Sequence, residues 1–375
     1  MILPLLLYSL ITLVFIQLIY HLVYFIRIPF FKRKTADESQ IEGVSIVVCA
    51  HNEEENLREL LPLLLEQDHP NYEIIIVDDK SSDGSYDFLT EEKLRHPKLK
   101  LVVIDSTPDA FNSKKYALTL GIKAAKNDIV LLTDADCRPN SKSWASEMAK
   151  TFDPETQIVL GYSHYQKSGG FLGKQIDFET LITGILYISS ALAFRPYMGV
   201  GRNLAYRKSF FLKNKGFYGM MELTGGDDDL FVNKYAKKKF TKVCIGSDVV
   251  LMSVPKKSWS TYYRQKLRHM AAGKHYKFRD KFRIGLFHIS LSLMWLNAFI
   301  LAFYWENLLD YKLLFGIAAG GFLLRLILLH TFFILAAKRF GVKVAGFLLI
   351  FSEIFYLKYY LLVGISAQFS KRIKW

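Results

Sequence analysis

Residues 127–139 read NDIVLLTDADCRP, and this stretch combines an apolar run with a pair of acids. Residues 129–132 are apolar, and Asp134 and Asp136 follow them one residue apart. An apolar run of this length predicts a strand that is buried on both faces. Open α/β folds bind their ligands at the carboxyl ends of such strands. Paired carboxylates there suit Mg²⁺ or Mn²⁺, and a polar loop cap is the alternative.

Strand and helix patterns alternate over the residues that precede this stretch. Loops carrying carboxylates follow three of the strands: HNEEEN, DDKSSDGS and DADCRP. Because parallel strands end at one edge of a sheet, the three loops are expected to lie together. The pattern predicts an α/β fold with a doubly wound, mostly parallel sheet. We expect strands at 44–49, 74–77, 101–104 and 129–133, and helices at 56–65 and 116–125.

Apolar segments flank this region on both sides. Residues 1–26 contain no Asp, Glu, Lys or Arg. This apolar stretch is long enough to be an uncleaved membrane anchor. Residues 284–304, 312–337 and 343–366 form a second apolar block, in which Glu353 and Lys358 interrupt the last segment. The block therefore predicts two or three membrane helices. Because 22% of the chain is charged, it is not a pure membrane bundle.

The net charge of +14 is concentrated beside the apolar segments. Basic residues at 27–34 and 274–283 place the region between them in the cytosol, by the positive-inside rule. The tail KRIKW contradicts this rule if all three C-terminal segments span. Anionic lipid headgroups account for the basic residues, so no nucleic-acid partner is expected. Cys49, Cys137 and Cys244 are too widely spaced for a zinc site and fit a reducing compartment.

The segments AHNEEENL, VDDKSSDGS, SKKYAL and TDADCRP together resemble the inverting family 2 glycosyltransferases of the GT-A type. The flanking apolar segments resemble those of membrane-bound members, namely bacterial polysaccharide synthases and lipid-linked sugar transferases. The resemblance implies a GT-A domain over residues 43–270, with a nucleotide-sugar half at 43–140 and an acceptor half at 141–270. The flanking parts are expected as an anchor (1–26), a basic linker (27–42), a basic juxtamembrane segment (271–283), a membrane region (284–366) and a basic tail (367–375).

The resemblance also implies a donor site that uses Mn²⁺ or Mg²⁺. Asp136 takes the position of the metal ligand, and Asp134 contacts the metal or the ribose. Lys115 is expected to be a solvated neighbour of this site. The other implied donor-binding residues are Asp79 for the base N–H, Glu53 for the ribose, Ala50 and Asn52 for the shape of the pocket, and Lys114 for the nucleotide.

The acceptor side is implied by GGDDDLF at 225–231 and by the segment 201–207, which resembles the family's sugar-pocket lining. Aligned with the family, Asp227 is the general base and Asp228 is its neighbour, while Gly226 replaces the usual glutamate. Adjacent acids repel one another, which can raise a pKa toward the range useful for a base. The alternative is that the acids stabilise the start of a helix.

Residues 263–269, YRQKLRH, resemble a second acceptor-side motif. Gln265 is implied to contact the acceptor and Arg268 the diphosphate. His269 stands where the family has a tryptophan, which counts against processive synthesis. Arg264 and Lys266 have an alternative role on the headgroups, in a basic helix that lies on the membrane.

These patterns predict an integral membrane glycosyltransferase at a bacterial-type plasma membrane. It would transfer a sugar from a nucleotide-sugar, with UDP the expected nucleotide, to a lipid-linked or glycan acceptor. Residues 171–194 are expected to form either an interfacial helix that feeds a lipid acceptor or a packed core helix. The alternatives are a processive polysaccharide synthase of the same family and a catalytically inactive nucleotide-sugar-binding or transport protein.

Overall fold

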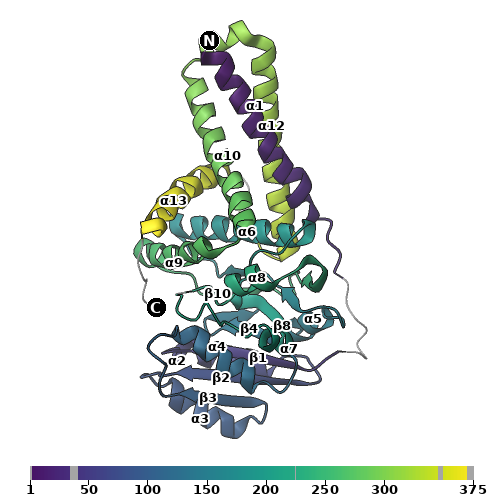
Figure 1. The fold of residues 1–375 in the computed structure, drawn as a ribbon, viewed down its shortest axis with the longest axis vertical. Helices are drawn as coiled ribbons and strands as arrows, with labels where there is room; N and C mark the ends of the chain where they lie inside the picture. The colour runs from purple at the N-terminus through teal and green to yellow at the C-terminus, as the bar shows by residue number, and fades with distance from the viewer. Residues whose placement is uncertain (1, 34–40, 224, 345–348, 370–375) are drawn as a thin grey trace.

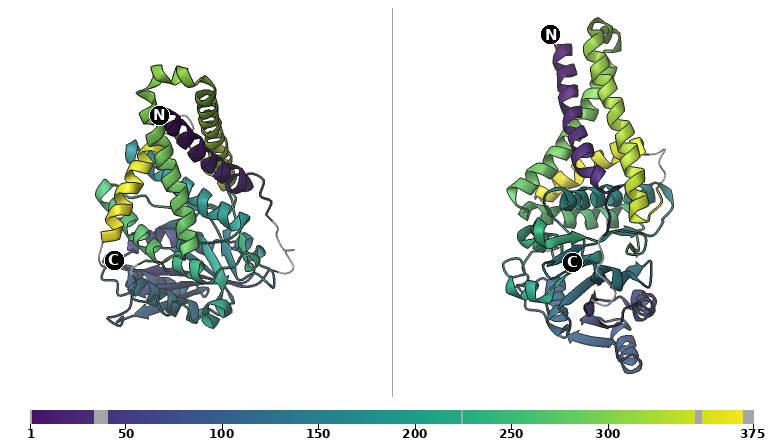
Figure 2. Two further views of the ribbon diagram at one scale, coloured as in Figure 1. Left: turned by 45° about the horizontal axis from the view of Figure 1, so that its top comes forward. Right: turned by 90° about the vertical axis from the view of Figure 1, so that its right-hand side faces the viewer.

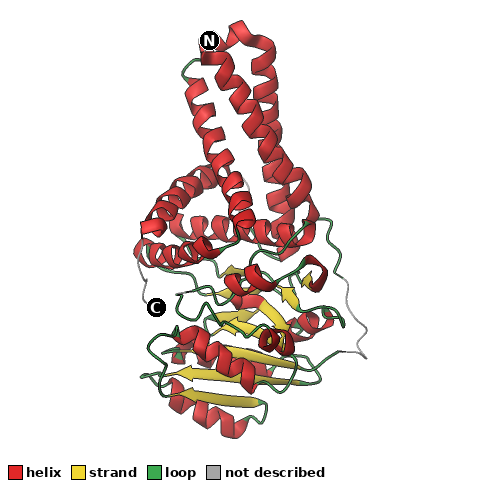
Figure 3. Cartoon of the chain, in the orientation of Figure 1, coloured by secondary structure: helices red, strands yellow, loops and turns green. Residues whose placement is uncertain are grey.

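A computed structural model describes residues 2–33, 41–223, 225–344 and 349–369. The described chain forms an α/β domain from which a bundle of long helices projects (Figure 1). All strands lie in the α/β domain, and the projecting part is entirely helical (Figure 3). Part of the expected basic linker, 34–40, and the end of the expected tail, 370–375, lie outside the described residues.

The main sheet has seven strands in the order β3-β2-β1-β4-β8-β6-β9. The first four in this order are mutually parallel, and β8 runs antiparallel to both β4 and β6. The predicted α/β fold with a mostly parallel sheet is therefore confirmed. The strands are β1 (Val44–Ala50), β2 (Tyr72–Asp79), β3 (Leu99–Ile104), β4 (Ile129–Asp134), β6 (Ile158–Leu160), β8 (Leu204–Arg207) and β9 (Thr241–Val243).

Helices cover both faces of this sheet because its central strands are apolar on both sides. Val47 and Val77 face the core around α4 (Ser113–Ala124), whereas Ile46 and Ile76 face the opposite core around α2 (Glu54–Leu65). This alternation follows the two-residue period of a strand. The remaining helices of the domain are α3 (Ser85–Arg95), α5 (Trp144–Lys150), α7 (Lys208–Lys213) and α8 (Asp229–Tyr235).

The predicted meeting of the three acidic loops is confirmed by the strand register. Ala50 at the end of β1 pairs with Asp78 of β2, and Cys49 pairs with Asp134 at the end of β4. A second, three-stranded sheet lies beside this edge, in the order β5-β10-β7. It consists of β5 (Cys137–Pro139), β7 (Ser163–Tyr165) and β10 (Leu251–Ser253), and it begins one residue after Asp136.

The projecting bundle consists of α1 (Ile2–Ile19), α10 (Phe278–Ala302) and α12 (Lys312–Phe340), with the short α11 (Trp305–Leu308) at its far end. Helix α1 packs against both α10 and α12. It continues as a π-helical segment (Tyr20–Tyr24) and then a 3₁₀-helical segment (Phe25–Arg27). The side chains that it turns outward include exposed Leu5, Tyr8 and Phe15. Such an apolar outer surface suits a bilayer.

Three further helices lie at the foot of the bundle, where it meets the α/β domain (Figures 1 and 2). Helix α6 (Gly170–Ala193) runs across the foot, and it packs against α13 (Leu349–Phe369), which also packs against α9 (Trp259–Ala272). Five helices of the described chain are long and apolar enough to cross a membrane, α6 and α13 among them. Since α6 lies across the bundle and is largely buried, its apolar residues serve packing.

An ion pair inside the helical part fixes α13. Arg325 of α12 and Glu353 of α13 are almost fully buried, and both guanidinium nitrogens contact the carboxylate, at 2.5 and 2.6 Å. The indole N–H of Trp295 on α10 donates to Glu353, and Arg325 also donates to Gln17 of α1. Charged groups at such depth require partners of this kind.

Candidate active site

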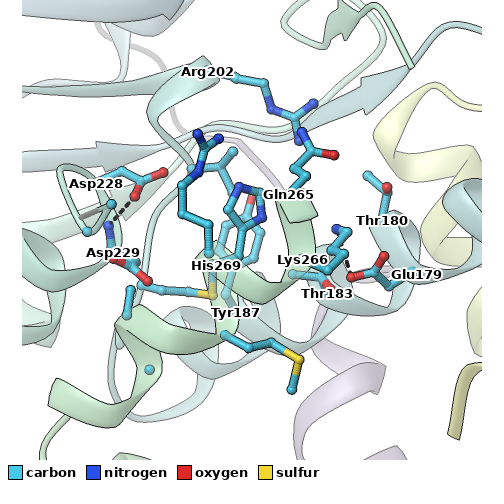
Figure 4. A pocket seen from close by; sticks show the side chains of 18 of the residues that line it. Glu179, Thr180, Thr183, Tyr187, Arg202, Asp228, Asp229, Gln265, Lys266 and His269 are labelled. Atoms are coloured by element: carbon cyan, nitrogen blue, oxygen red, sulfur yellow. Dashed lines mark hydrogen bonds and ion pairs between the residues drawn. The ribbon is translucent and has the colours of Figure 1, made fainter. Parts of the chain in front are cut away.

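A cavity of about 700 Å³ begins at the acidic edge of the sheet and extends to the helices at the foot of the bundle. Figure 4 shows Arg202, Gln265, Lys266 and His269 around it. Most of the residues singled out from the sequence line it. They are Glu53, Lys114, Asp134, Asp136, Asp227, Asp228, Gln265, Arg268 and His269. Ala50, Asn52 and Asp79 lie outside its lining.

Lys114 is the central cation at the sheet end of the cavity. It comes from the first turn of α4, and its ammonium nitrogen lies 3.0 Å from Asp134 and 3.3 Å from Asp227. Burial alone would lower the pKa of Lys114, but Asp134, Asp227 and Asp228 together raise it well above 10.5. Burial would raise the pKa of Asp134, and Lys114 instead brings it below 3.8. This lysine and aspartate are therefore both charged at neutral pH.

Asp136 lies in the turn between β4 and β5, at the cavity wall. The N–H of Val254 donates to its carbonyl oxygen at 3.1 Å, which fixes the turn to the end of β10. Within the described chain no ion pair engages the Asp136 carboxylate, whereas Asp134 is neutralised by Lys114. No three acidic, histidine or cysteine side chains gather as a closed metal centre among the described residues.

The carboxylates of Asp134 and Asp136 therefore fit an open site for a hard divalent cation. One or two protein carboxylates are typical where substrate phosphates and water supply the remaining oxygen ligands. Asp136, and with it Asp134, would hold such an ion.

The loops after β1 and β2 brace each other. Asn52, in a left-handed conformation with φ of 55°, accepts through its side chain from the N–H groups of Ser82 and Asp83. Asp79 is buried; one carboxylate oxygen accepts from the Ser113 hydroxyl, and the other has no hydrogen bond in the described chain but lies 3.5 Å from the Lys80 ammonium nitrogen. Asn52 thus shapes this edge by holding the loops together, from outside the cavity lining.

Glu53 follows Asn52 and faces the cavity. Its carboxylate accepts a 2.6 Å hydrogen bond from the side-chain amide of Asn56 on α2. Burial raises the pKa of Glu53 despite this bond. The first turns of α2 therefore hold the Glu53 side chain at the sheet end of the cavity.

The three acids at the start of α8 have different partners. Asp227 faces Lys114. Asp228 caps the helix, and its two oxygens accept from the backbone N–H groups of Asp229 and Gly201, each at 2.7 Å. Asp229 accepts from the Tyr276 hydroxyl. Burial, and then Asp227, raise the pKa of Asp228 to about 6; burial, and then Asp228, raise that of Asp229 to about 8.

The departure from the family at Gly226 has a conformational reason. Gly225 and Gly226 adopt φ of 72° and 78°, which favours glycine over other residues. A Cβ at Gly226 would also lie 2.4 Å from the Leu230 side chain. The chain therefore turns tightly before Asp227, and a glutamate in this turn would be strained.

Helix α9 brings Gln265, Arg268 and His269 to the cavity. Gln265 donates to the Tyr165 hydroxyl at 3.2 Å, and the Arg202 guanidinium stacks 4.4 Å from the same ring. His269 is open to the cavity yet enclosed by protein. Burial, followed by Lys266 and Arg268, lowers the pKa of His269 well below 6.5, so the ring is neutral.

Two lysines differ from expectation. Lys115 was expected to be solvated but is fully buried, and it donates to the carbonyls of Met220 and Leu223. It thereby anchors the loop that leads to Asp227. Lys266 was a candidate for the headgroups, but it is about nine-tenths buried and lies 2.8 Å from Glu179 of α6. Each lysine finds its partner on a segment distant in sequence, which local patterns cannot reveal.

Sequence reasoning also missed several residues of the cavity wall. Tyr162 and Tyr165 come from the segment that contains β7, and Glu179 and Thr180 come from α6. Glu179 gives no distinct signal, because it follows Lys174 and Asp177 in the polar first half of α6. The tyrosines give no signal either, since aromatic residues are ordinary in a core.

Comparison with known proteins shows which proteins this chain is similar to. Residues 45–213 match the family described as "Glycosyl transferase family 2". The "Probable glycosyltransferase YdaM" of Bacillus subtilis (strain 168) is 26% identical over 251 residues, which is 63% of this chain and 56% of the relative. The "Poly-beta-1,6-N-acetyl-D-glucosamine synthase" of Staphylococcus epidermidis is 29% identical over 187 residues, 49% of this chain and 43% of the relative. The chain thus spans about half the length of these relatives.

Among solved structures, the mannosyltransferase PcManGT from Pyrobaculum calidifontis, in complex with GDP-Man and Mn²⁺, is similar to this chain. The TM-score is 0.59 at 21% sequence identity, and the match covers 89% of this chain and 97% of the other. At this identity the likeness concerns the fold, which is of the GT-A type.

Proposed function

We propose, from the match of residues 45–213 to glycosyl transferase family 2 and from the GT-A fold, that the protein is a membrane-bound, inverting glycosyltransferase. It transfers a sugar from a nucleotide-sugar to a lipid-linked or glycan acceptor that is presented at the membrane surface. The expected donor nucleotide is UDP.

One observation carries this proposal: the cavity is continuous from the acidic edge to the membrane-side helices. The same cavity is lined by Lys114 and Asp136 at one end and by His288 of α10 and Tyr360 of α13 at the other. Catalytic sites lie at this edge of doubly wound sheets. An acceptor anchored in a bilayer around the bundle can reach the acids through this cavity without leaving the membrane surface.

The reaction follows from the positions of the acids. Asp227 takes the proton of the acceptor hydroxyl, the hydroxyl oxygen bonds to the anomeric carbon of the donor sugar, and the bond from that carbon to the diphosphate breaks. This single displacement inverts the anomeric centre. Lys114, Arg202 and Arg268 hold the negatively charged leaving group. Asp136 and Asp134 would hold a divalent cation, which would supply Lewis-acid stabilisation of the diphosphate.

The donor nucleotide would lie over the ends of β1 and β2. A buried carboxylate oxygen of Asp79 lies 3.5 Å from the Lys80 ammonium nitrogen and has no hydrogen bond in the described chain, and we assign it to an N–H of the base. Glu53, in the cavity wall, is assigned to the ribose. Asn52 and Ala50 shape this end from beneath.

Orientation in the membrane is proposed from charge. Lys277 and Arg279, at the start of α10, flank Phe278, which is 79% exposed. A basic and aromatic rim at the foot of the bundle suits anionic headgroups on the cytosolic side. The α/β domain is then cytosolic. Since α13 packs against α6 and α9 at this foot, the bundle of α1, α10 and α12 accounts for the spans.

Processive polysaccharide synthesis is the second candidate, and His269 is the observation that bears on it. A histidine ring at the cavity presents less stacking area than the tryptophan of the resembled synthases. We therefore favour transfer of one sugar per acceptor. The length of the product distinguishes this single transfer from processive synthesis.

The proposal is tested with purified full-length protein in detergent or nanodiscs. A panel of nucleotide-sugars is supplied with Mn²⁺ and a membrane extract, and release of nucleoside diphosphate is scored. We expect release with at least one donor, increased by the extract. Absence of release with every donor, while the protein is folded by thermal unfolding, would contradict the proposal and favour the inactive binding or transport protein.

A further inference from the structure

The segment that leads into α10 holds one face of α8. Asp229 and Asn233 lie one turn apart on α8, so their side chains share a face. The Tyr276 hydroxyl donates to Asp229 at 2.7 Å, and the backbone N–H of Lys277 donates to the Asn233 side chain at 3.0 Å. The Asn233 amide in turn donates to Asp280, in the first turn of α10, at 3.1 Å. Figure 1 shows α8 beneath the foot of α10.

These contacts bear on the proposed base because α8 is short. It has seven residues, and a helix of this length depends on packing for its stability. Asp228 caps the helix, and the Asp229 N–H donates to the Asp228 carboxylate at 2.7 Å (Figure 4). Asp227 precedes the cap and lies 3.3 Å from Lys114. A shift of α8 would therefore move the Asp227 carboxylate relative to Lys114.

The other side of these contacts is anchored in the helical bundle. The Asp280 carboxylate is fully buried, and its oxygens lie 3.3 Å from Arg283 and 3.5 Å from Arg195. A buried carboxylate needs such partners, because an uncompensated charge at this depth is costly. The Tyr20 hydroxyl of α1 donates to the Arg283 carbonyl at 2.6 Å. Helix α8 is thus joined to the helices of the bundle as well as to the sheet.

We propose that Tyr276 is a positioning residue for glycosyl transfer. Its hydroxyl holds the Asp229 carboxyl group, which fixes the first turn of α8 and with it the direction of Asp227. The ring packs against Tyr197, with centroids 6.1 Å apart, and this contact supports the aim of the hydroxyl. The inference rests on the proposed function and adds to it a residue that acts through Asp229 and takes no proton from the acceptor.

Two other roles for Tyr276 give different kinetics. Tyr276 lines the cavity, so a direct contact with the acceptor is one alternative. Such a contact, made equally before and during transfer, would raise KM when it is lost, whereas a misplaced base lowers kcat and leaves KM alone. A role in stability alone would lower the unfolding temperature and change neither constant.

The test compares Tyr276→Phe with the wild type in full-length protein. It uses the nucleotide-sugar and the membrane extract that support release of nucleoside diphosphate. We expect kcat to fall about three- to tenfold, the size of one lost hydrogen bond. The apparent KM values for the donor and for the extract should stay within about twofold. Calorimetric binding of the nucleoside diphosphate with Mn²⁺ should keep its stoichiometry, which shows that the folded fraction is unchanged.

Tyr72→Phe is the matched control. Tyr72 is 3% exposed, and its hydroxyl donates to the Leu65 carbonyl at 2.6 Å, which is a comparable hydrogen bond outside the cavity lining. The control makes the same chemical change far from α8, so its kcat should equal that of the wild type. A kcat for Tyr276→Phe equal to that of Tyr72→Phe would overturn the positioning role, and so would a rise in the KM for the extract at an unchanged kcat.

A double variant tests whether Tyr276 acts through Asp229. Asp229→Ala removes the acceptor of the hydrogen bond, so adding Tyr276→Phe to it should lower kcat no further. Two independent effects that multiply would overturn the link between these residues, although glycosyl transfer itself would stand. Failure of the wild type to release nucleoside diphosphate from any donor would instead contradict the proposed function, and this inference with it.

Discussion

The ammonium group of Lys114 lies 3.3 Å from a carboxylate oxygen of Asp227. The lysine that we assign to the leaving group and the acid that we assign to the acceptor proton thus form one ion pair. A diphosphate that takes over Lys114 leaves Asp227 free to accept a proton. Donor binding would in this way prepare the base before transfer.

Replacing Lys114 with methionine should therefore weaken both steps. It removes a charge-assisted contact with the diphosphate and leaves Asp134 and Asp227 facing each other without a cation. We expect the donor KM to rise about 10- to 100-fold, as for loss of a hydrogen bond to a charged group. Lys123→Met, at an exposed position of the same helix, is the control. Equal donor KM values for the two variants would contradict this assignment.

Asp136→Asn tests the metal site. No ion pair engages the carboxylate of Asp136 in the described chain, so its loss should act on metal binding with little effect on the fold. We expect the Mn²⁺ concentration for half-maximal activity to rise at least about tenfold, and calorimetric binding of nucleoside diphosphate to lose its Mn²⁺ dependence. Unchanged Mn²⁺ dependence would remove Asp136 from the site.

The raised pKa of Asp229 predicts a pH dependence of stability. The folded protein holds the Asp229 proton up to about pH 8. The stability that this proton contributes is therefore fully present below the ordinary pKa of 3.8 and is lost as pH rises through 8. Asp229→Asn keeps an acceptor for the Tyr276 hydroxyl and removes the titration. We expect the variant to lose less thermal stability than the wild type between pH 6 and pH 9. Parallel curves for the two proteins would show that Asp229 does not titrate in this way.

The buried pair of Arg325 and Glu353 predicts a contrast between single and double variants. Glu353→Gln leaves the buried guanidinium of Arg325 without a counter-charge. Such a change lowers the free energy of unfolding by about 3–5 kcal/mol in known cases. Replacing both residues with methionine removes the charges together and should cost much less. Thermal unfolding in detergent measures both, with Lys358→Met on the exposed side of α13 as control. A double variant as unstable as Glu353→Gln would contradict this account.

The sequence predicted the four parallel strands of the sheet because their signals are local. β-branched runs end in acids at Asp79 and Asp134, and parallel strands bring such ends together. Lys115, Lys266 and Glu179 could not be placed in this way. Their charges suggest solvent, and their burial depends on carbonyls and side chains contributed by distant segments. The course of α13 is similar: its composition suits a membrane span, and only the contacts of Glu353 with Arg325 and Trp295 show where it packs.

Comparison of Asp227→Asn with Asp228→Asn tests the central claim most directly. Asp228 is tied by two backbone N–H groups, whereas Asp227 faces Lys114 in the cavity. We predict that Asp227→Asn still binds nucleoside diphosphate with Mn²⁺ but transfers sugar about 10²- to 10⁴-fold more slowly, the range for loss of a general base. Transfer at the wild-type rate by Asp227→Asn, with loss of transfer in Asp228→Asn, would contradict the account.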